Sequence, residues 1–231
     1  MLKKLIKGFS DLFYPRYCFA CNKDVPPQGM IICIKCEAEL PLTNFHHYKE
    51  NPFTERFAGK VNIATGTALY HFTKGSKTQN LIHQLKYKGK KSIGIECGEY
   101  LGSLLKDSPL YKDIDVLIPV PMHPKKEHER GYNQANLIAE GISNSSGIPW
   151  TSKMLLKSKA TTSQTKKGRL ERSENVEDVF CIAKKANFKA KNVLLVDDIL
   201  TTGATLEHCA SLILDDGAKS VSLATLGITK F

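Results

Sequence analysis

The chain has 231 residues, of which 42% are hydrophobic and 24% are charged, and its formal net charge is +10. This composition supports a packed core and excludes global disorder, and no stretch approaches the roughly 18–20 consecutive apolar residues of a membrane span. The length fits one domain of ordinary size plus a small accessory piece.

The positive charge is concentrated in residues 61–192. Such a charge suits a polyanionic partner: nucleic acid, an acidic membrane surface or a multiply phosphorylated small molecule. A lysine-rich solvated surface explains the same composition, and both interpretations stay open.

Residues 1–14 are predicted to form an amphipathic helix. Apolar residues recur there at helical spacing with lysines between them: Leu2, Leu5, Ile6, Phe9, Leu12 and Phe13. The pattern is too interrupted for the apolar region of a secretory signal, so we expect a cytoplasmic protein whose cysteines stay reduced. We expect the apolar stripe to pack against the domain that follows, with peripheral membrane contact as the alternative.

Four of the seven cysteines form two Cys-x-x-Cys pairs: Cys18, Cys21, Cys33 and Cys36. Two such loops supply the four thiolates that tetrahedral zinc prefers, and the short gap between them indicates a compact knuckle. Residues 1–40 are therefore predicted to hold the helix and a zinc-finger module whose Zn²⁺ is structural. Free thiols or two disulfides are the alternatives, and contact with nucleic acid or a protein partner is a secondary hypothesis.

Residues 41–62 show no clear period and are predicted to be a linker or irregular lobe. In residues 63–231, apolar runs alternate with helical patterns, which indicates an α/β domain with a parallel sheet and helices on both faces. Strands are expected at 65–72, 115–120, 192–196 and 219–227, and helices at 76–87, 92–106, 131–146 and 203–216. Ligands of such sheets bind beyond the carboxyl ends of the strands, so the loops after Val120 and Val196 are the candidate site.

The segment 193–205, VLLVDDILTTGAT, runs from an apolar strand into two acids and a Thr/Gly-rich turn. Small residues let backbone N–H groups converge, and a following helix N-terminus adds partial positive charge, so the turn can hold a phosphate. Acids beside a phosphate cradle suggest a sugar phosphate. An Asp-Asp turn followed by a Thr-capped helix is the alternative.

This segment resembles the phosphoribosyl pyrophosphate (PRPP) motif of type I phosphoribosyltransferases. The resemblance implies that Asp197 and Asp198 bind the ribose hydroxyls, with Mg²⁺ accompanying PRPP. It also implies that the 5′-phosphate is bound by the loop residues Thr201, Thr202, Gly203, Ala204 and Thr205.

The corresponding family loop after the earlier strand binds pyrophosphate, which implies that role for Met122, His123 and Arg130. A polar loop before a helix is the alternative. The basic stretch 158–175 has almost no apolar side chains and is predicted to be a flexible lid over pyrophosphate, or else a solvated loop. Its candidate residues are Gln164, Lys166, Lys167 and Arg169.

The order of these pieces resembles the ComF family over almost the full length: the cysteine knuckle, LKYKGK (85–90), PVPMHP (119–124), RGYNQA (130–135) and VDDILTTGAT (196–205). These competence-associated proteins combine a phosphoribosyltransferase-like domain with an N-terminal zinc finger. Lysines stand at 125, 126 and 159 where family members are more arginine-rich, and the predicted lid lacks the usual proline after its threonine. These departures weaken the expected bidentate phosphate contacts but leave the sugar-phosphate cradle intact.

The family resemblance implies a PRPP-binding protein of DNA uptake and natural transformation that handles single-stranded DNA with other uptake proteins. The alternative is an active phosphoribosyltransferase that transfers phosphoribose to a nitrogen nucleophile. No residue is assigned as a catalytic base. A DNA-handling adaptor, with Tyr87 and Tyr132 as candidates for base stacking, is a further hypothesis.

Overall fold

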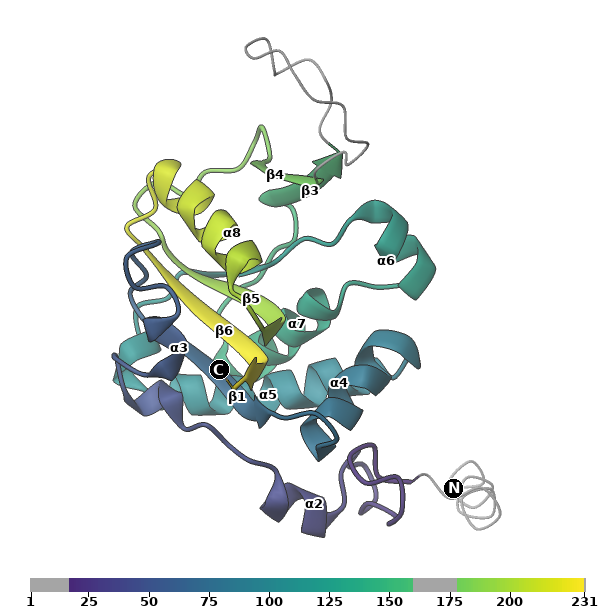
Figure 1. Cartoon of the computed structure of the whole chain (residues 1–231). Coiled ribbons are helices and arrows are strands. Elements are labelled where there is room, and N and C mark those ends of the chain that lie inside the picture. The colour runs from purple at the N-terminus through teal and green to yellow at the C-terminus, as the bar shows by residue number, and fades with distance from the viewer. Residues whose placement is uncertain (1–16, 160–177, 231) are drawn as a thin grey trace.

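The computed structural model describes residues 17–159 and 178–230 (Figure 1). Its centre is a sheet of four parallel strands, in the order β1 (Gly66–Phe72), β6 (Ser220–Thr229), β5 (Asn192–Leu200) and β2 (Val116–Pro119). The strands read as near-continuous apolar runs because both faces of the sheet are covered. All four predicted strands are present, with ends that differ from the predicted ones by at most four residues.

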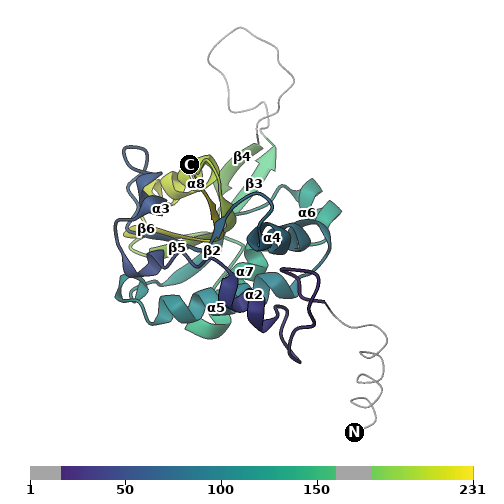
Figure 2. The same ribbon diagram turned by 60° about the horizontal axis from the view of Figure 1, so that its bottom comes forward.

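The two faces of the sheet carry different helices (Figures 1 and 2). One apolar cluster joins the sheet to α4 (Lys77–Tyr87), α5 (Ser92–Lys106) and α7 (Gln134–Ser146). The other joins it to α3 (Pro52–Glu55) and α8 (Ala204–Asp215). The predicted class, a parallel sheet with helices on both faces, is confirmed.

Helix α7 lies unusually close to α5 because glycines line their contact. A Cβ added to Gly141 would stand 2.1 Å from the carbonyl oxygen of Ile95, and one on Gly98 would stand 2.5 Å from that of Ile138. Only glycine permits this backbone approach. The contact fixes α7 and therefore the loop at its N-terminus, which borders the candidate site.

Strand β5 is longer than predicted. Its pairing with β2 ends at Val196 opposite Pro119, but its pairing with β6 continues to Leu200 opposite Ile228. Asp197 and Asp198 therefore lie inside a strand rather than in a loop after Val196. The prediction failed because β6 extends the ladder on one side. On the other side of β5, the residues after Val196 have no neighbouring strand among the described residues.

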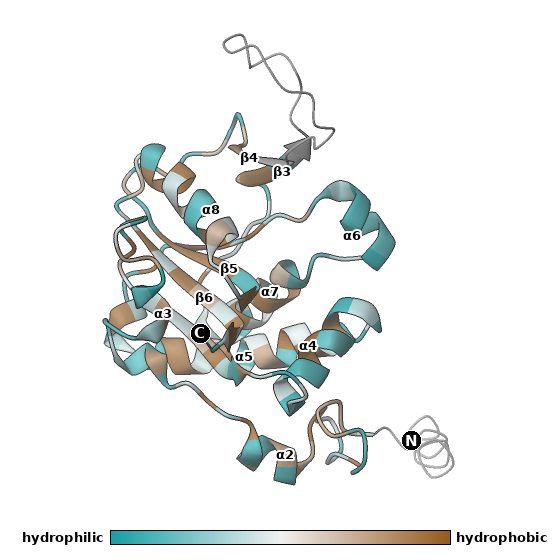
Figure 3. Cartoon of the chain, viewed as in Figure 1, coloured by the Kyte–Doolittle hydropathy of each residue, from teal (hydrophilic) through white to brown (hydrophobic). Residues whose placement is uncertain are grey.

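The segment between β2 and α7 is helical where a loop was predicted. Helix α6 (Pro124–Arg130) begins with Pro124. The ring nitrogen Nδ1 of His123 caps it by accepting a hydrogen bond from the Lys125 N–H at 3.1 Å. Gly131, with φ 77°, ends the helix. These are ordinary start and stop signals within a strongly polar sequence. Figure 3 shows α6 as hydrophilic along its length, and none of its residues is buried. The predicted helix at 131–146 begins only at Gln134.

An antiparallel hairpin of β3 (Leu155–Lys159) and β4 (Asp178–Ile182) was not predicted. Its strands are far apart in the sequence, so no turn motif marks it. The predicted lid residues Gln164, Lys166, Lys167 and Arg169 lie outside the described residues, as does the predicted helix at 1–14.

The segment 41–62, predicted to be a linker or irregular lobe, contains short helices and packs on the sheet. It contains η1 (Phe45–His47) and α3, and its Leu42 bridges to Tyr70 of β1. Phe53 and Phe57 are fully buried against the α8 face of the sheet. In the described ranges, 17–159 and 178–230, we find no helix with the length and apolar character that crossing a membrane requires.

Candidate ligand site and metal centre

A cavity of 260 Å³ opens where the loop after β2 meets the unpaired side of β5. It brings together six residues that the sequence predicted from two separate motifs: Met122, His123, Arg130, Asp197, Asp198 and Thr205. Lys126, Asn133, Gln134, Lys157 and Phe180 also line it. Parallel strands place their carboxyl ends at one edge of a sheet, which is why residues some seventy positions apart converge here.

The two acids of the cavity point to opposite faces of β5, because side chains alternate along a strand. Asp198 shares a face of β5 with Leu194 and Val196, which pack in the same cluster as α4. On that face, its Oδ2 lies 2.9 Å from Lys86 Nζ. Asp197 lies on the α8 face and accepts the N–H of Asp198 at 2.8 Å. Burial, reinforced by the charge of Asp198, raises the pKa of Asp197 to about 7.

The predicted phosphate loop is anchored from behind by the segment 53–57. The buried guanidinium of Arg56 donates to the carbonyl oxygens of Thr201 and Thr229. Gly203 has φ +88°, and a Cβ there would lie 3.3 Å from the Phe57 ring. The loop is therefore held in one shape, with the first turn of α8, whose N–H groups lack partners within the helix, directly after it.

On the opposite wall, the start of α7 holds the other predicted loop. Asn133 donates to the Val120 carbonyl at 2.9 Å and caps α7 by accepting the Ala135 N–H at 3.0 Å. Arg130 donates to Gln134 Oε1 at 3.1 Å. Gln134 is fully buried, and its Nε2 has no hydrogen-bond partner among the described residues. A buried donor without a partner is costly, so a ligand oxygen in this cavity would relieve it.

Some predicted residues stand apart from the cavity. Thr201, Thr202 and Ala204 are exposed on the loop beside it and do not line it. Tyr132 is buried and donates to the Leu85 carbonyl, so it packs the core rather than stacking on bases. Tyr87 is 62% exposed, with Arg130 lying 5.3 Å from its ring centre.

The sequence prediction missed three side chains around the cavity: Arg56, Lys86 and Lys157. Arg56 lies in the segment interpreted as a linker, and Lys157 lies in an unpredicted strand. Lys86 belongs to the LKYKGK segment but was assigned no role. Its one signal in the sequence is that it immediately follows Leu85, which is the last buried residue of α4.

The four predicted metal ligands converge at a second site. The sulfurs of Cys18, Cys21, Cys33 and Cys36 all lie within 4.8 Å of one another, and the Cys33 N–H donates to Cys18 Sγ at 3.3 Å. Tetrahedral zinc with Zn–S bonds of about 2.3 Å needs sulfurs about 3.8 Å apart. The separation of 4.0 Å between the Cys21 and Cys33 sulfurs fits that geometry. The cluster is thus able to hold a metal ion such as zinc.

The cysteine knuckle is docked on α4. Asn80 donates to the Ala20 carbonyl at 2.9 Å, and Gln84 donates to the Phe19 carbonyl at 2.7 Å. At the edge of this contact, Lys77 pairs with Glu39. Cys18, Cys33 and Cys36 are buried in the same apolar cluster as α5 and α7. The knuckle therefore shares its core with the α/β domain.

A basic groove follows the seam between the knuckle and α4. Two adjoining depressions of 690 and 610 Å³ share Asn22, Gln84 and Lys90. The remaining walls present cations and aromatic rings, from His83, Lys88, Lys91, Tyr17 and Phe19.

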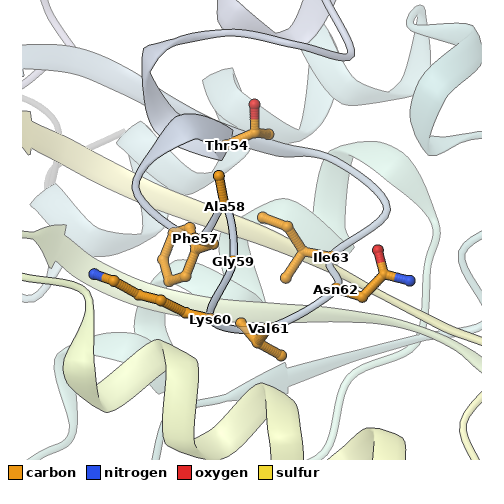
Figure 4. Close-up of a pocket in the computed structure, with 8 residues that line it drawn as sticks. All are labelled: Thr54, Phe57, Ala58, Gly59, Lys60, Val61, Asn62 and Ile63. Atoms are coloured by element: carbon orange, nitrogen blue, oxygen red, sulfur yellow. The ribbon is translucent and has the colours of Figure 1, made fainter.

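A further cavity of 410 Å³ lies at the loop from Phe57 to Ile63 (Figure 4). Its lining is mainly small or apolar, and the side chains of Lys60 and Asn62 extend from opposite sides of the loop. It contains none of the acids or donors gathered beside β5, and we assign it no chemistry.

Comparison with known proteins agrees with this arrangement. Residues 133–227 match the family model of the phosphoribosyl transferase domain. The chain is 32% identical over 147 residues to "Competence protein F" of Haemophilus influenzae, covering 62% of this chain and 64% of that protein. It is 40% identical over 114 residues to "Competence protein ComFC" of Bacillus subtilis, covering 48% and 43%. It is 26% identical over 146 residues to "DNA utilization protein YhgH" of Salmonella typhimurium, covering 62% and 63%.

The chain therefore spans no more than 64% of the length of these three relatives. The resemblance found in the sequence is confirmed: the homologues carry the names Competence protein F, ComFC and YhgH, and residues 133–227 form a match to the phosphoribosyl transferase domain.

Proposed function

We propose that this homologue of Competence protein F binds PRPP in the cavity beside β5. The observation that carries the proposal is the convergence, in one cavity of 260 Å³, of the acid pair, Thr205 and the Met122–Arg130 wall. Each group matches one part of such a ligand, and an arrangement with acids on one side and cations on the other suits a molecule with both hydroxyl and phosphate groups.

The division of roles follows from chemistry. Carboxylates accept hydrogen bonds from hydroxyls, so Asp197 and Asp198 bind the ribose. The first turn of α8 and the loop from Thr201 to Thr205 bind the 5′-phosphate through N–H groups, hydroxyls and the helix dipole. Arg130 and the unpaired Nε2 of Gln134 bind the diphosphate, with backbone amides near Met122 and His123.

The acid pair also suits Mg²⁺, which prefers oxygen ligands and is usually held by one or two carboxylates together with substrate phosphates. When bound, this ion neutralises charge on the diphosphate. If the protein also transfers phosphoribose to a nitrogen nucleophile, then Arg130 and Gln134 stabilise the departing charge. The cysteine cluster is proposed to hold structural Zn²⁺, since it is buried in the core and contributes no group to the ligand cavity.

A titration tests the ligand. We expect isothermal titration of PRPP with Mg²⁺ to give a saturable heat that Asp197→Asn removes. The matched control is Asp113→Asn, an equivalent change at an exposed acid with no place in the cavity. Absence of heat with the wild-type protein, or equal binding by Asp197→Asn, contradicts the proposal. Release of pyrophosphate with a panel of amines and bases then tests transfer.

A second candidate function, binding of single-stranded DNA during uptake in the cytoplasm, is favoured by the groove between the knuckle and α4. Lysines that track phosphates and exposed rings that stack on bases are the usual elements of such sites. We expect anisotropy of a labelled oligonucleotide to report binding that weakens with salt and weakens again in Lys88→Met and Lys90→Met. Lys106→Met, at the exposed end of α5, is the control. Binding unchanged by both groove variants contradicts this assignment.

A further inference from the structure

Lys86 contacts the acid pair directly, and neither sequence motif assigned it a role. It lies in the last turn of α4, with its Nζ 2.9 Å from Asp198 Oδ2. The side chains of Lys86 and Asp198 are only 20% and 12% exposed. An ion pair shielded to this degree is stronger than a surface pair, because water screens it less.

The backbone around Lys86 is held from three directions. Gln84 donates to the Phe19 carbonyl of the knuckle, Tyr132 donates to the Leu85 carbonyl, and Arg130 lies over the Tyr87 ring. The neighbours of Lys86 in the chain are thus fixed, whereas its own side chain has a flexible four-carbon stem. Lys86 reaches the cavity through its contact with Asp198, which lines it, and its ammonium group is able to move without movement of α4.

Other cationic and polar groups face the acids from different elements. Lys157 of β3 lies on the Asp197 side, and Lys126, His123 and Arg130 line the opposite wall. Lys86 forms an ion pair with Asp198. A free divalent cation that approaches Asp198 is therefore repelled by the positive charge of Lys86. A cation that arrives bound to a diphosphate brings negative charge with which the ammonium can pair.

We propose that Lys86 is the resident counterion of Asp198 and that it makes the site reject free divalent cations while accepting a cation bound to a diphosphate ligand. On this proposal the ammonium leaves Asp198 when the ligand enters and then pairs with the diphosphate. The identity of that ligand rests on the proposed function, but the rejection of free metal does not.

Mn²⁺ alone is the first probe, with its binding measured by electron paramagnetic resonance without PRPP. We expect Lys86→Met to bind Mn²⁺ roughly tenfold more tightly than wild type, since one opposing charge in a partly buried site is removed. Lys86→Arg, which keeps the charge, should stay near wild type, and so should Lys106→Met. Adding Asp198→Asn to Lys86→Met should abolish the gain, which places the ion at the acid pair.

PRPP with Mg²⁺ is the second probe. We expect its affinity to fall roughly tenfold in Lys86→Met, opposite in sign to the effect on Mn²⁺. If Lys86 only fastens α4, then Lys86→Met lowers the melting temperature but leaves Mn²⁺ binding unchanged, and the inference is overturned. If wild type fails to bind PRPP while Lys86→Met still gains Mn²⁺, the proposed function fails and the counterion role stands.

Discussion

Replacing Asp197 with asparagine should stabilise the protein at alkaline pH while it removes ligand binding. Burial and the nearby charge of Asp198 raise the pKa of Asp197 from 3.8 to about 7 in the folded protein. The folded state thus binds this proton more tightly than the unfolded state. The contribution of Asp197 to the free energy of unfolding therefore falls as the pH rises from about 4 to about 7, and it levels off above that range.

The size of the effect follows from about 1.36 kcal/mol for each pKa unit. Between pH 5 and pH 8 the raised pKa of Asp197 corresponds to a loss of about 2–3 kcal/mol at most, reduced where water or Lys86 screens the carboxylate. Asparagine keeps the oxygen that accepts the Asp198 N–H but carries no charge. The stabilising effect of Asp197→Asn should therefore be small at pH 5 and larger at pH 8.

Urea denaturation of wild type, Asp197→Asn and the exposed-acid control Asp113→Asn at pH 5 and pH 8 measures this difference. The control should show the same small difference at both values. If Asp197→Asn is equally or less stable than wild type at pH 8, then the carboxylate is not destabilised by burial, and our account of its environment is wrong.

Three further predictions concern the supports of the two sites. Gly141→Ala should lower the free energy of unfolding by about 1–3 kcal/mol, because its Cβ would meet the Ile95 carbonyl. Denaturation measures this loss, with Ser143→Ala as the control. A loss in free energy no larger than that of the control would contradict the close α5–α7 contact. Arg56→Met should weaken PRPP binding in titration, because the loop at Thr201 loses its anchor; unchanged affinity would show that the loop holds its shape unaided. Elemental analysis should find one zinc per chain, and Cys33→Ser should lose it together with thermal stability; full zinc content in that variant would exclude the cysteine centre.

The parts of the molecule predicted correctly are those encoded by short, local patterns. The four cysteines carry their signal within a few residues and converge in the fold, and the helices α5 and α8 begin and end within one residue of the predicted positions. Local spacing suffices for such features because neighbouring residues in the chain also meet in space.

The parts that were missed depend on contacts between distant segments. Arg56 reaches Thr201 across 145 positions, and Lys86 meets Asp198 only because α4 packs against the α7-bearing face of the sheet. The extension of β5 likewise depends on the length of β6. No local pattern records which distant strand or helix will lie alongside, so these features needed the folded chain.

The burial of the cysteine centre within the core of the larger domain has a consequence for the lifetime of the protein. If the knuckle binds a metal as proposed, loss of that ion leaves the thiols of Cys18 and Cys36 without a common ligand, and the knuckle is held less firmly in the apolar cluster that it shares with α4 and α5. The loosened knuckle would then be open to proteolysis next to α4, the helix that carries Lys86. The supply of metal would in this way affect the amount of undegraded protein as well as its folding.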